Sequence, residues 1–322
     1  MTRELIAAAG AGRMGRGIAV VFAYSGHTVR LVDLKARDTT EFERVAADAQ
    51  REIRVALETL GDLGVMPSAA IEPIAARVSV HAGPGALADA DVIFEGVPET
   101  RAAKNAALAA ISAAARPDAI IASTTSTMLS TELQDLVTHP ARFLNAHWLN
   151  PAYLVPLVEV SPGARTDPDV VERMKSLLER IGKIPVVCKA SPGYIVPRIQ
   201  ALAMNEAARL VEEGVASAED VDRAIKYGFG LRYAVLGLLE FIDWGGGDIL
   251  YYASRYLREA TGDERFAAPK IVEDNMHAGR IGMRSGAGFY DFGEMDVERY
   301  KRERLGAYVA LLRHFNLLKP PG

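Results

Sequence analysis

The first part of the chain alternates short, continuous apolar runs with longer segments of helical spacing. The apolar runs have the length of buried strands and cover residues 4–9, 28–32, 78–80, 91–95 and 119–123. Between them, apolar residues recur three and four positions apart, which is typical of helices packed on a sheet. These segments cover residues 16–24, 39–77 (a long helix with a short second piece at 71–77) and 101–114. This alternation predicts an α/β fold with a doubly wound, mostly parallel sheet.

The pattern changes near residue 190. A predicted helix at 168–181 and a strand at 184–188 are followed by Ser191-Pro192-Gly193, and no strand pattern occurs after this break. The later patterns are helical and cover residues 198–213, a segment starting at Ser217, and residues 236–242, 249–257 and 297–318. We therefore expect an α/β domain of residues 1–190 and an all-helical domain of residues 191–322. The last helix is basic and amphipathic, and we expect it to pack on the protein body or on a partner subunit rather than on a membrane.

A glycine motif stands between the first predicted strand and the first helix. Gly10, Gly12 and Gly15 have the spacing G-x-G-x-x-G, with Arg13 and Met14 inside the motif. A strand, this motif and a helix in that order form the fingerprint of a Rossmann-type dinucleotide site. The first glycine allows the tight turn, the second admits the pyrophosphate, and the third lets the helix approach the strand. The free N–H groups of the helix N-terminus then face the phosphates.

The second strand ends on an acidic residue, Asp33. A carboxylate there can accept hydrogen bonds from both ribose hydroxyls of the cofactor and repels a 2′-phosphate, so we expect NAD rather than NADP. Lys35 and Arg37 lie close enough in sequence to leave that choice slightly open.

Two strand-like runs, 142–148 and 157–160, flank a turn rich in Asn and Pro. If the runs fold back on each other about Tyr153, His147 and Glu159 become opposite neighbours, with Cβ atoms about 5 Å apart. A carboxylate that holds one imidazole nitrogen fixes the tautomer and raises the basicity of the other, as in a general base that works near neutral pH. The alternative interpretation is a surface hairpin in which the two residues meet by chance.

Polar residues follow the strands predicted at 91–95 and 119–123. Ligands of doubly wound sheets bind beyond the carboxyl ends of the strands, where we expect Glu99, Lys104 and Ser126. In the alternative interpretation Glu99 and Lys104 form a solvated pair at the start of a helix, and the hydroxyl residues only cap the next helix.

Composition narrows the classes of function. The chain has 322 residues, a formal net charge of −4 and 49% hydrophobic residues, which is ordinary for a globular protein and gives no general attraction to nucleic acid or anionic membranes. The apolar run at residues 5–10 is too short for a signal peptide, and no stretch approaches the ~20 residues of a membrane span. The single cysteine, Cys188, indicates a reducing compartment, so we expect a cytoplasmic protein. One Cys and scattered His residues give no metal-ligand cluster, and we expect no metal.

These motifs together resemble the L-3-hydroxyacyl-CoA dehydrogenase family, including its branch with lambda-crystallin/L-gulonate 3-dehydrogenase and carnitine dehydrogenase. The likeness runs in order from about residue 4 to residue 292. It is carried by residues 10–19, 95–99 with Lys104, 122–127, 147–159 and 192–195, and in the helical part by 205–222 and 286–290.

The resemblance implies a role for each matching residue. His147 would be the general base that takes the hydroxyl proton, and Glu159 would orient it. Ser126 would hydrogen-bond the substrate oxygen, while Asn150 would help to fix the nicotinamide and the histidine. Glu99 and Lys104 would hold the nicotinamide ribose. The family also implies that residues 1–190 bind NAD and that residues 191–322 contribute substrate and dimer contacts, so we expect a homodimer.

Two departures from the family pattern concern the substrate. In the segment Pro-Gly-Phe-Ile/Val-x-Asn-Arg, the asparagine that contacts substrate is replaced here by Pro197. Residues 39–77, where coenzyme A binders of the family present lysines to the nucleotide phosphates, contain no lysine. The segment around Arg232 is similar to the branch that oxidises small free hydroxy acids, and an arginine can grip a carboxylate through two parallel hydrogen bonds. Otherwise Arg232 makes a surface or interdomain ion pair.

We therefore expect an NAD-dependent oxidoreductase that interconverts an L-3-hydroxyacyl substrate, such as 3-hydroxybutyryl-CoA, and its 3-oxo product. The alternative is a dehydrogenase of a small free hydroxy acid, like L-gulonate or carnitine, with Arg232 on the carboxylate. A minor alternative is a non-catalytic NAD-binding protein of the lambda-crystallin kind.

Overall fold

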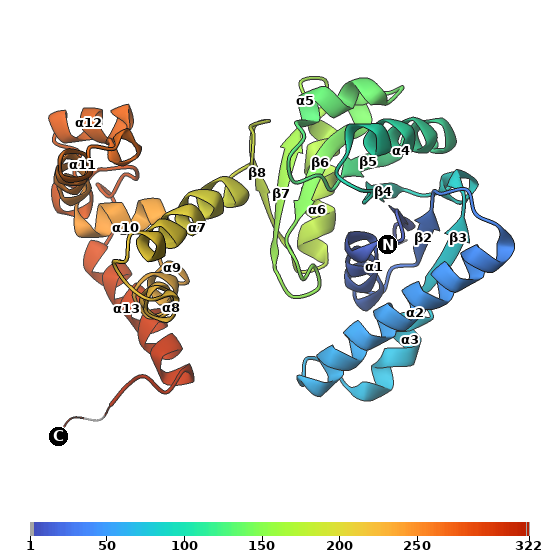
Figure 1. Cartoon of the computed structure of the whole chain (residues 1–322), viewed down its shortest axis with the longest axis horizontal. Helices are drawn as coiled ribbons and strands as arrows, with labels where there is room; N and C mark the ends of the chain where they lie inside the picture. Colours follow the sequence, from blue (N-terminus) through green and yellow to red (C-terminus); the bar gives the residue numbers. More distant parts are fainter. Residues whose placement is uncertain (1–2, 320, 322) are drawn as a thin grey trace. The chain divides into compact units, whose positions relative to one another are not determined.

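The structure is a computed structural model that describes residues 3–319 and 321. The chain divides into two compact units, residues 1–203 and residues 204–322 (Figure 1). The division falls inside helix α7 (Val196–Glu212), whereas the sequence predicts the boundary near residue 190. Pro197 lies in the first turn of this helix, where a missing N–H is tolerated.

Unit 1 contains an eight-stranded sheet in the order β3-β2-β1-β4-β5-β6-β7-β8. Strands β1 to β6 run parallel to one another, whereas β7 and β8, which are parallel to each other, run antiparallel to these six strands. The strands are β1 (Ile6–Ala9), β2 (Val29–Asp33), β3 (Val78–Ala82), β4 (Val92–Glu95), β5 (Ile120–Ser123), β6 (Phe143–Trp148), β7 (Leu157–Pro162) and β8 (Ile184–Val187). The predicted α/β fold with a doubly wound, mostly parallel sheet is confirmed.

Helices cover both faces of this sheet because its strands are apolar on both sides. Within β1, Ile6 and Ala8 join a core with the helices of one face, and Ala7 and Ala9 join a core on the other. The first face carries α1 (Arg13–Tyr24), α2 (Thr39–Asp62), α3 (Ile71–Ala75) and α6 (Pro168–Arg180). The second carries α4 (Arg101–Ala114) and the short α5 (Ser130–Leu133).

The antiparallel hairpin of β6 and β7 has the register that the sequence predicts. His147 pairs with Glu159, and Trp148 pairs with Val158. Side chains alternate between the faces of a strand, so Trp148 enters the core with α1 while His147 points to the side of α4 and α5.

Unit 2 is helical, as predicted, and its described residues form the rest of α7 and six further α-helices joined by a π-helical segment and short turns. The helices are α8 (Ala218–Ala224), α9 (Leu231–Tyr233), α10 (Leu238–Gly245), α11 (Gly247–Thr261), α12 (Lys270–His277) and α13 (Val297–His314), with the π-helical segment at Ile225–Gly230. Helix α12 is not predicted from the sequence. Within the described residues no helix has the length and apolar character needed to cross a membrane.

A buried carboxylate organises the end of unit 2. Asp243 of α10 is 2% exposed and accepts hydrogen bonds from the backbone N–H groups of Phe289 (3.0 Å) and Tyr290 (2.8 Å). A Cβ at Gly288 would lie 2.1 Å from the Asp243 carboxylate, so only glycine fits there. Asp243 therefore has a structural role, which is to hold the glycine-rich segment 286–290 in place.

Candidate active site

His147 contacts the expected Glu159 and also Ser126, which the resemblance assigns to the substrate oxygen. Its Nδ1 lies 2.8 Å from Oε2 of Glu159, and its Nε2 lies 3.1 Å from the hydroxyl oxygen of Ser126. All three come from separate segments: β6, β7 and the loop after β5. Because Glu159 can only accept when ionised, Nδ1 of a neutral His147 donates and Nε2 keeps its lone pair toward Ser126. His147 is 3% exposed, which excludes the surface-hairpin interpretation.

Glu159 is held on both of its oxygens. Its Oε1 accepts hydrogen bonds from the backbone N–H groups of Ile195 and Val196, each at 2.9 Å, while Oε2 faces His147. The side chain is fully buried. These two donors come from the segment after β8 and fix the carboxylate in the orientation that His147 requires.

Tyr194 is a site residue that the sequence analysis missed. Its ring stacks on the imidazole of His147, with centroids 4.9 Å apart and planes 5° apart. Its hydroxyl accepts from the amide of Asn145 (3.0 Å) and donates to the carbonyl of Thr125 (2.8 Å). Burial raises the pKa of the Tyr194 phenol well above its usual range, so it stays a neutral donor. Only its place in the motif 192–195 could have drawn notice in the sequence.

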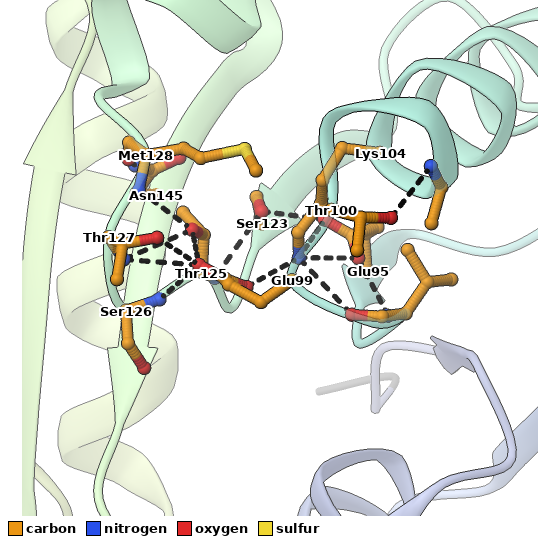
Figure 2. A network of polar contacts seen from close by, with 12 residues as sticks. Glu95, Glu99, Thr100, Lys104, Ser123, Thr125, Ser126, Thr127, Met128 and Asn145 are labelled. Carbon is orange, nitrogen blue, oxygen red and sulfur yellow. Dashed lines mark hydrogen bonds and ion pairs between the residues drawn. The ribbon is translucent and has the colours of Figure 1, made fainter.

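Glu99 anchors the loop that carries Ser126 (Figure 2). Its Oε1 accepts from the N–H groups of Ser126 (3.0 Å) and Thr127 (3.1 Å), from the Thr127 hydroxyl (2.9 Å) and from the Thr125 hydroxyl. Burial raises the pKa of Glu99, but the hydroxyl donors and the charge of Lys104 outweigh it, and the pKa lies below its usual value. The predicted positions of Glu99 and Ser126 beyond the strand ends are confirmed.

Lys104 requires a correction. The resemblance implies that Lys104 holds the cofactor ribose with Glu99, yet the side chain is 1% exposed and its ammonium lies 2.9 Å from Glu95 at the end of β4 (Figure 2). Its distance to Glu99 is 3.4 Å. Glu95 itself is fully buried and also accepts from the hydroxyl of Ser123 at 2.6 Å. Lys104 is thus a buried counter-ion that reaches a ligand only through Glu99, and the solvated-pair alternative is also wrong.

The glycine motif leaves room for a dinucleotide. A Cβ at Gly15 would lie 2.0 Å from the carbonyl oxygen of Gly10, and one at Gly10 would lie 2.7 Å from that of Gly96, so helix and strands meet closely here. At Gly12, by contrast, a Cβ would meet nothing within 4 Å, and the open space is where a pyrophosphate can approach the backbone. Arg13 and Met14 begin α1 beside this space. A cleft of about 250 Å³ lies over the motif and extends to Asp33.

Asp33 closes the far end of this cleft and is already paired. Its carboxylate lies 2.5 Å from Nε of Arg37 and accepts from the backbone N–H of Lys35 at 3.2 Å. Arg37 also pairs with Glu41 at 2.9 Å. The hydrogen bond to Asp33 raises the pKa of Arg37 above its usual value. The arginine that left NADP open in the sequence is therefore held by two carboxylates.

Asn150 and Arg232 line separate cavities, each described within its own unit. Asn150 follows β6 and, with Arg13, Arg16 and Tyr153, lines a cavity of about 360 Å³ beside α1. Arg232 of α9 stacks over the ring of Phe241 at 4.8 Å and donates to the carbonyl of Gly228. It lines a cavity of about 140 Å³ in unit 2, and it makes no ion pair with the described residues of that unit.

Comparison with known proteins decides the family. The profile of the 3-hydroxyacyl-CoA dehydrogenase NAD-binding domain matches residues 5–191, and that of the C-terminal domain of the same enzymes matches residues 193–292. The chain belongs to the 3-hydroxyacyl-CoA dehydrogenase family. Its cofactor is NAD, as the glycine motif predicts, and the chain is an NAD-dependent oxidoreductase.

Its relatives within the family are named after different substrates. A 5-formyl-3-hydroxy-2-methylpyridine 4-carboxylate 5-dehydrogenase from Mesorhizobium japonicum is 32% identical over 96% of this chain and 97% of its own length. An L-carnitine dehydrogenase from Burkholderia mallei is 35% identical over 76% of this chain and 74% of its own. The solved 3-hydroxyacyl-CoA dehydrogenase from Archaeoglobus fulgidus has a TM-score of 0.79 at 32% identity and covers 98% of this chain and 100% of its own.

Within residues 3–319 and 321, no group of three or more His, Cys, Asp or Glu residues is arranged to hold a metal ion. The candidate site thus consists of the cleft over the glycine motif and the His147 cluster.

Proposed function

We propose that this chain catalyses the reversible NAD-dependent oxidation of a 3-hydroxyacyl substrate to its 3-oxo product, with His147 as the general base. The proposal rests above all on one arrangement, in which the imidazole lies between the Glu159 carboxylate (2.8 Å) and the Ser126 hydroxyl (3.1 Å). A buried histidine that donates to a carboxylate from one nitrogen and keeps a lone pair on the other can take a proton there.

Each residue of the cluster has a part in that step. Ser126 donates to the substrate oxygen and brings the substrate hydroxyl within reach of Nε2. His147 takes the hydroxyl proton at Nε2 and becomes cationic. Glu159 stabilises this cation, and because Ile195 and Val196 hold its other oxygen, it does so without reorganising. Bound NAD supplies the hydride acceptor.

Two further residues are proposed to hold the cofactor. Glu99 keeps one carboxylate oxygen on the Ser126 loop, and its side chain is 35% exposed, so the other oxygen can accept from a ribose hydroxyl. The buried ammonium of Lys104 lies 3.4 Å from the Glu99 carboxylate and holds it in this position. Asn150 stands between the hairpin and the first turn of α1, where its amide can contact a nicotinamide.

For the rest of the substrate we propose a coenzyme A thioester, the class named for the Archaeoglobus fulgidus structure that covers almost the whole chain. A small free hydroxy acid is the second candidate, with Arg232 on its carboxylate. It is favoured by helix α2, which has no lysine and whose Arg51 and Arg54 pair with Asp48 and Glu72, each at 2.7 Å. It is also favoured by the relatives named for carnitine and for a pyridine carboxylate.

The test is NADH formation from a matched pair, L-3-hydroxybutyryl-CoA and free L-3-hydroxybutyrate, together with L-gulonate and L-carnitine. Faster turnover of the thioester supports the first substrate class, and turnover of a free acid alone supports the second. For His147→Gln we expect a loss of about 10²–10⁴-fold in kcat with NAD affinity kept, because only the base is removed. An unchanged rate would falsify the role of His147, and no turnover of any of the four would leave the non-catalytic alternative.

A further inference from the structure

We propose that Tyr194 is a positioning residue that acts on both partners of the proton transfer, with its ring on His147 and its hydroxyl on the Ser126 loop. The inference rests on the proposed function, since it assigns a task in the same step. It concerns a residue that neither accepts a proton nor touches the cleft over the glycine motif.

The ring has the geometry to stabilise a cationic imidazole. It lies 4.9 Å from His147 with the planes 5° apart, so its negative face covers the imidazole. A cation placed over the face of an aromatic ring is stabilised by it, so this contact favours the protonated imidazole. Glu159 supplies the other stabilising contact, at the edge of the imidazole, and the backbone N–H groups that hold Glu159 belong to the two residues after Tyr194.

The hydroxyl fixes the donor loop. It donates to the carbonyl of Thr125, and it accepts from Asn145, whose amide also donates to the carbonyl of Met128 (3.0 Å). The two carbonyls flank Ser126 on either side. Asn145 lies two residues before His147 and on the same face of β6, so one phenol ties the loop to the strand that carries the base.

The backbone at Tyr194 indicates that this placement is imposed. Its φ is +46°, in the left-handed region that side chains other than glycine rarely adopt, and it directly follows Gly193 with φ +74°. A tyrosine in this strained conformation persists only where the surrounding contacts determine it, which is common at functional sites. Here the stacked ring and the two hydrogen bonds of the hydroxyl supply those contacts.

Two variants separate the ring from the hydroxyl. Tyr194→Phe keeps the ring, so we expect kcat to fall about tenfold with the affinity for NAD unchanged, because a loosened Ser126 loop misplaces the donor. Ser126→Ala should then lower kcat by a smaller factor in the Tyr194→Phe background than in the wild type, since both changes disturb the same loop.

Tyr194→Leu also removes the aromatic face, so the protonated imidazole loses a stabilising contact. The acid limb of the pH profile of kcat/KM should therefore move to lower pH by about half a unit. Tyr24→Phe, an exposed tyrosine of α1, is the control and should leave all three measurements unchanged.

A spectroscopic measurement tests the stacking without any substrate. The Cε1–H signal of His147, assigned by its absence in His147→Gln, should be shifted upfield by the stacked ring in the wild type and in Tyr194→Phe, and should lose that shift in Tyr194→Leu. If the wild type oxidises none of the offered substrates, the proposed function fails while this test still stands. An unmoved signal in Tyr194→Leu, or full additivity of Ser126→Ala and Tyr194→Phe, overturns the role of Tyr194.

Discussion

At the scale of single residues, two acidic side chains near the cleft do different work. Glu95 is fully buried and is neutralised by the buried Lys104, so it joins β4 to the start of α4. Glu99, four residues later, is partly exposed and gathers the donors of the loop that carries Ser126. Its lowered pKa keeps the carboxylate ionised throughout the neutral range, and the loop is therefore anchored over the whole range of expected activity.

Glu99→Gln should show this anchoring as a pH-dependent loss of stability. A carboxyl group whose pKa is lower in the folded than in the unfolded protein stabilises the folded state at every pH above its unfolded-state pKa. This stabilisation is lost as the pH falls through the folded-state pKa. We expect the variant to be less stable by about 1 kcal/mol at pH 7 and pH 5, with the partial exposure allowed for. The difference should shrink below the ordinary value of 4.5. Urea unfolding at pH 7, 5 and 3.5 measures it, with Glu43→Gln on the exposed side of α2 as control; a gap that persists at pH 3.5 contradicts the assignment.

Single residues also show where sequence reasoning stops. His147, Glu159, Ser126 and the glycines follow from strand ends and hairpin symmetry, which are local patterns. Tyr194 does not, because it contacts Asn145 across 49 positions of sequence and has a backbone angle that no apolar pattern encodes. Lys104 was misplaced for a similar reason: its spacing fits the helix start, and only the fold reveals that Glu95 lies beneath it.

At the scale of elements, the loop between β6 and β7 is held from outside the hairpin. The ammonium of Lys183, just before β8, donates to the carbonyls of Ala152 (2.6 Å) and Val155 (2.7 Å), and it lies 5.7 Å from the centre of the Trp148 ring. Burial lowers the pKa of Lys183. A cation that satisfies two carbonyl oxygens shapes the turn after Asn150, and nothing in the sequence around residue 183 signals this contact.

Lys183→Met should therefore destabilise unit 1. We expect a loss of about 1–3 kcal/mol in the free energy of unfolding, because one buried and one partly buried carbonyl lose a charged donor. The matched control is Lys175→Met on α6, whose ammonium pairs with Glu172 at 2.8 Å in solvent and should therefore contribute far less than Lys183. Denaturant midpoints at unchanged slope give both values. Equal effects for the two lysines would contradict the role of Lys183.

At the scale of the whole molecule, two units with separate cores share one chain. Unit 1 buries its sheet between two layers of helices, whereas the buried residues of unit 2 include Val221, Val272 and Phe292. The sequence predicts both units because sheet and helix periodicity differ. It misses α12, which has three apolar residues among eight and starts after Pro269 without a side-chain cap. A homodimer and a cytoplasmic location stay predictions.

Binding of NAD should be visible as a difference between the units. NAD at about 100 times its Kd stabilises the bound form by ~2.7 kcal/mol. Amide protons of unit 1 that exchange only when the whole unit unfolds should therefore exchange about 100-fold more slowly. We expect the slowing in β1, β4 and the first turn of α1, and little change in α11 and α12. Hydrogen exchange followed by mass spectrometry, with and without NAD, measures both units at once. Equal slowing in both would show that they open together.

The hairpin register has a consequence for the tolerated lengths of its parts. Side chains on a strand alternate in direction, so inserting or deleting one residue within β6 or β7 would turn His147 or Glu159 toward the apolar core that holds Val158 and Val160. Residues 149–156 lie outside the paired strands, so an insertion or deletion of one residue there does not reverse any side chain of the strands. In proteins descended from the same ancestor, gaps should therefore accumulate between the two strands, and the distance from each site residue to its end of the turn should change only in steps of two.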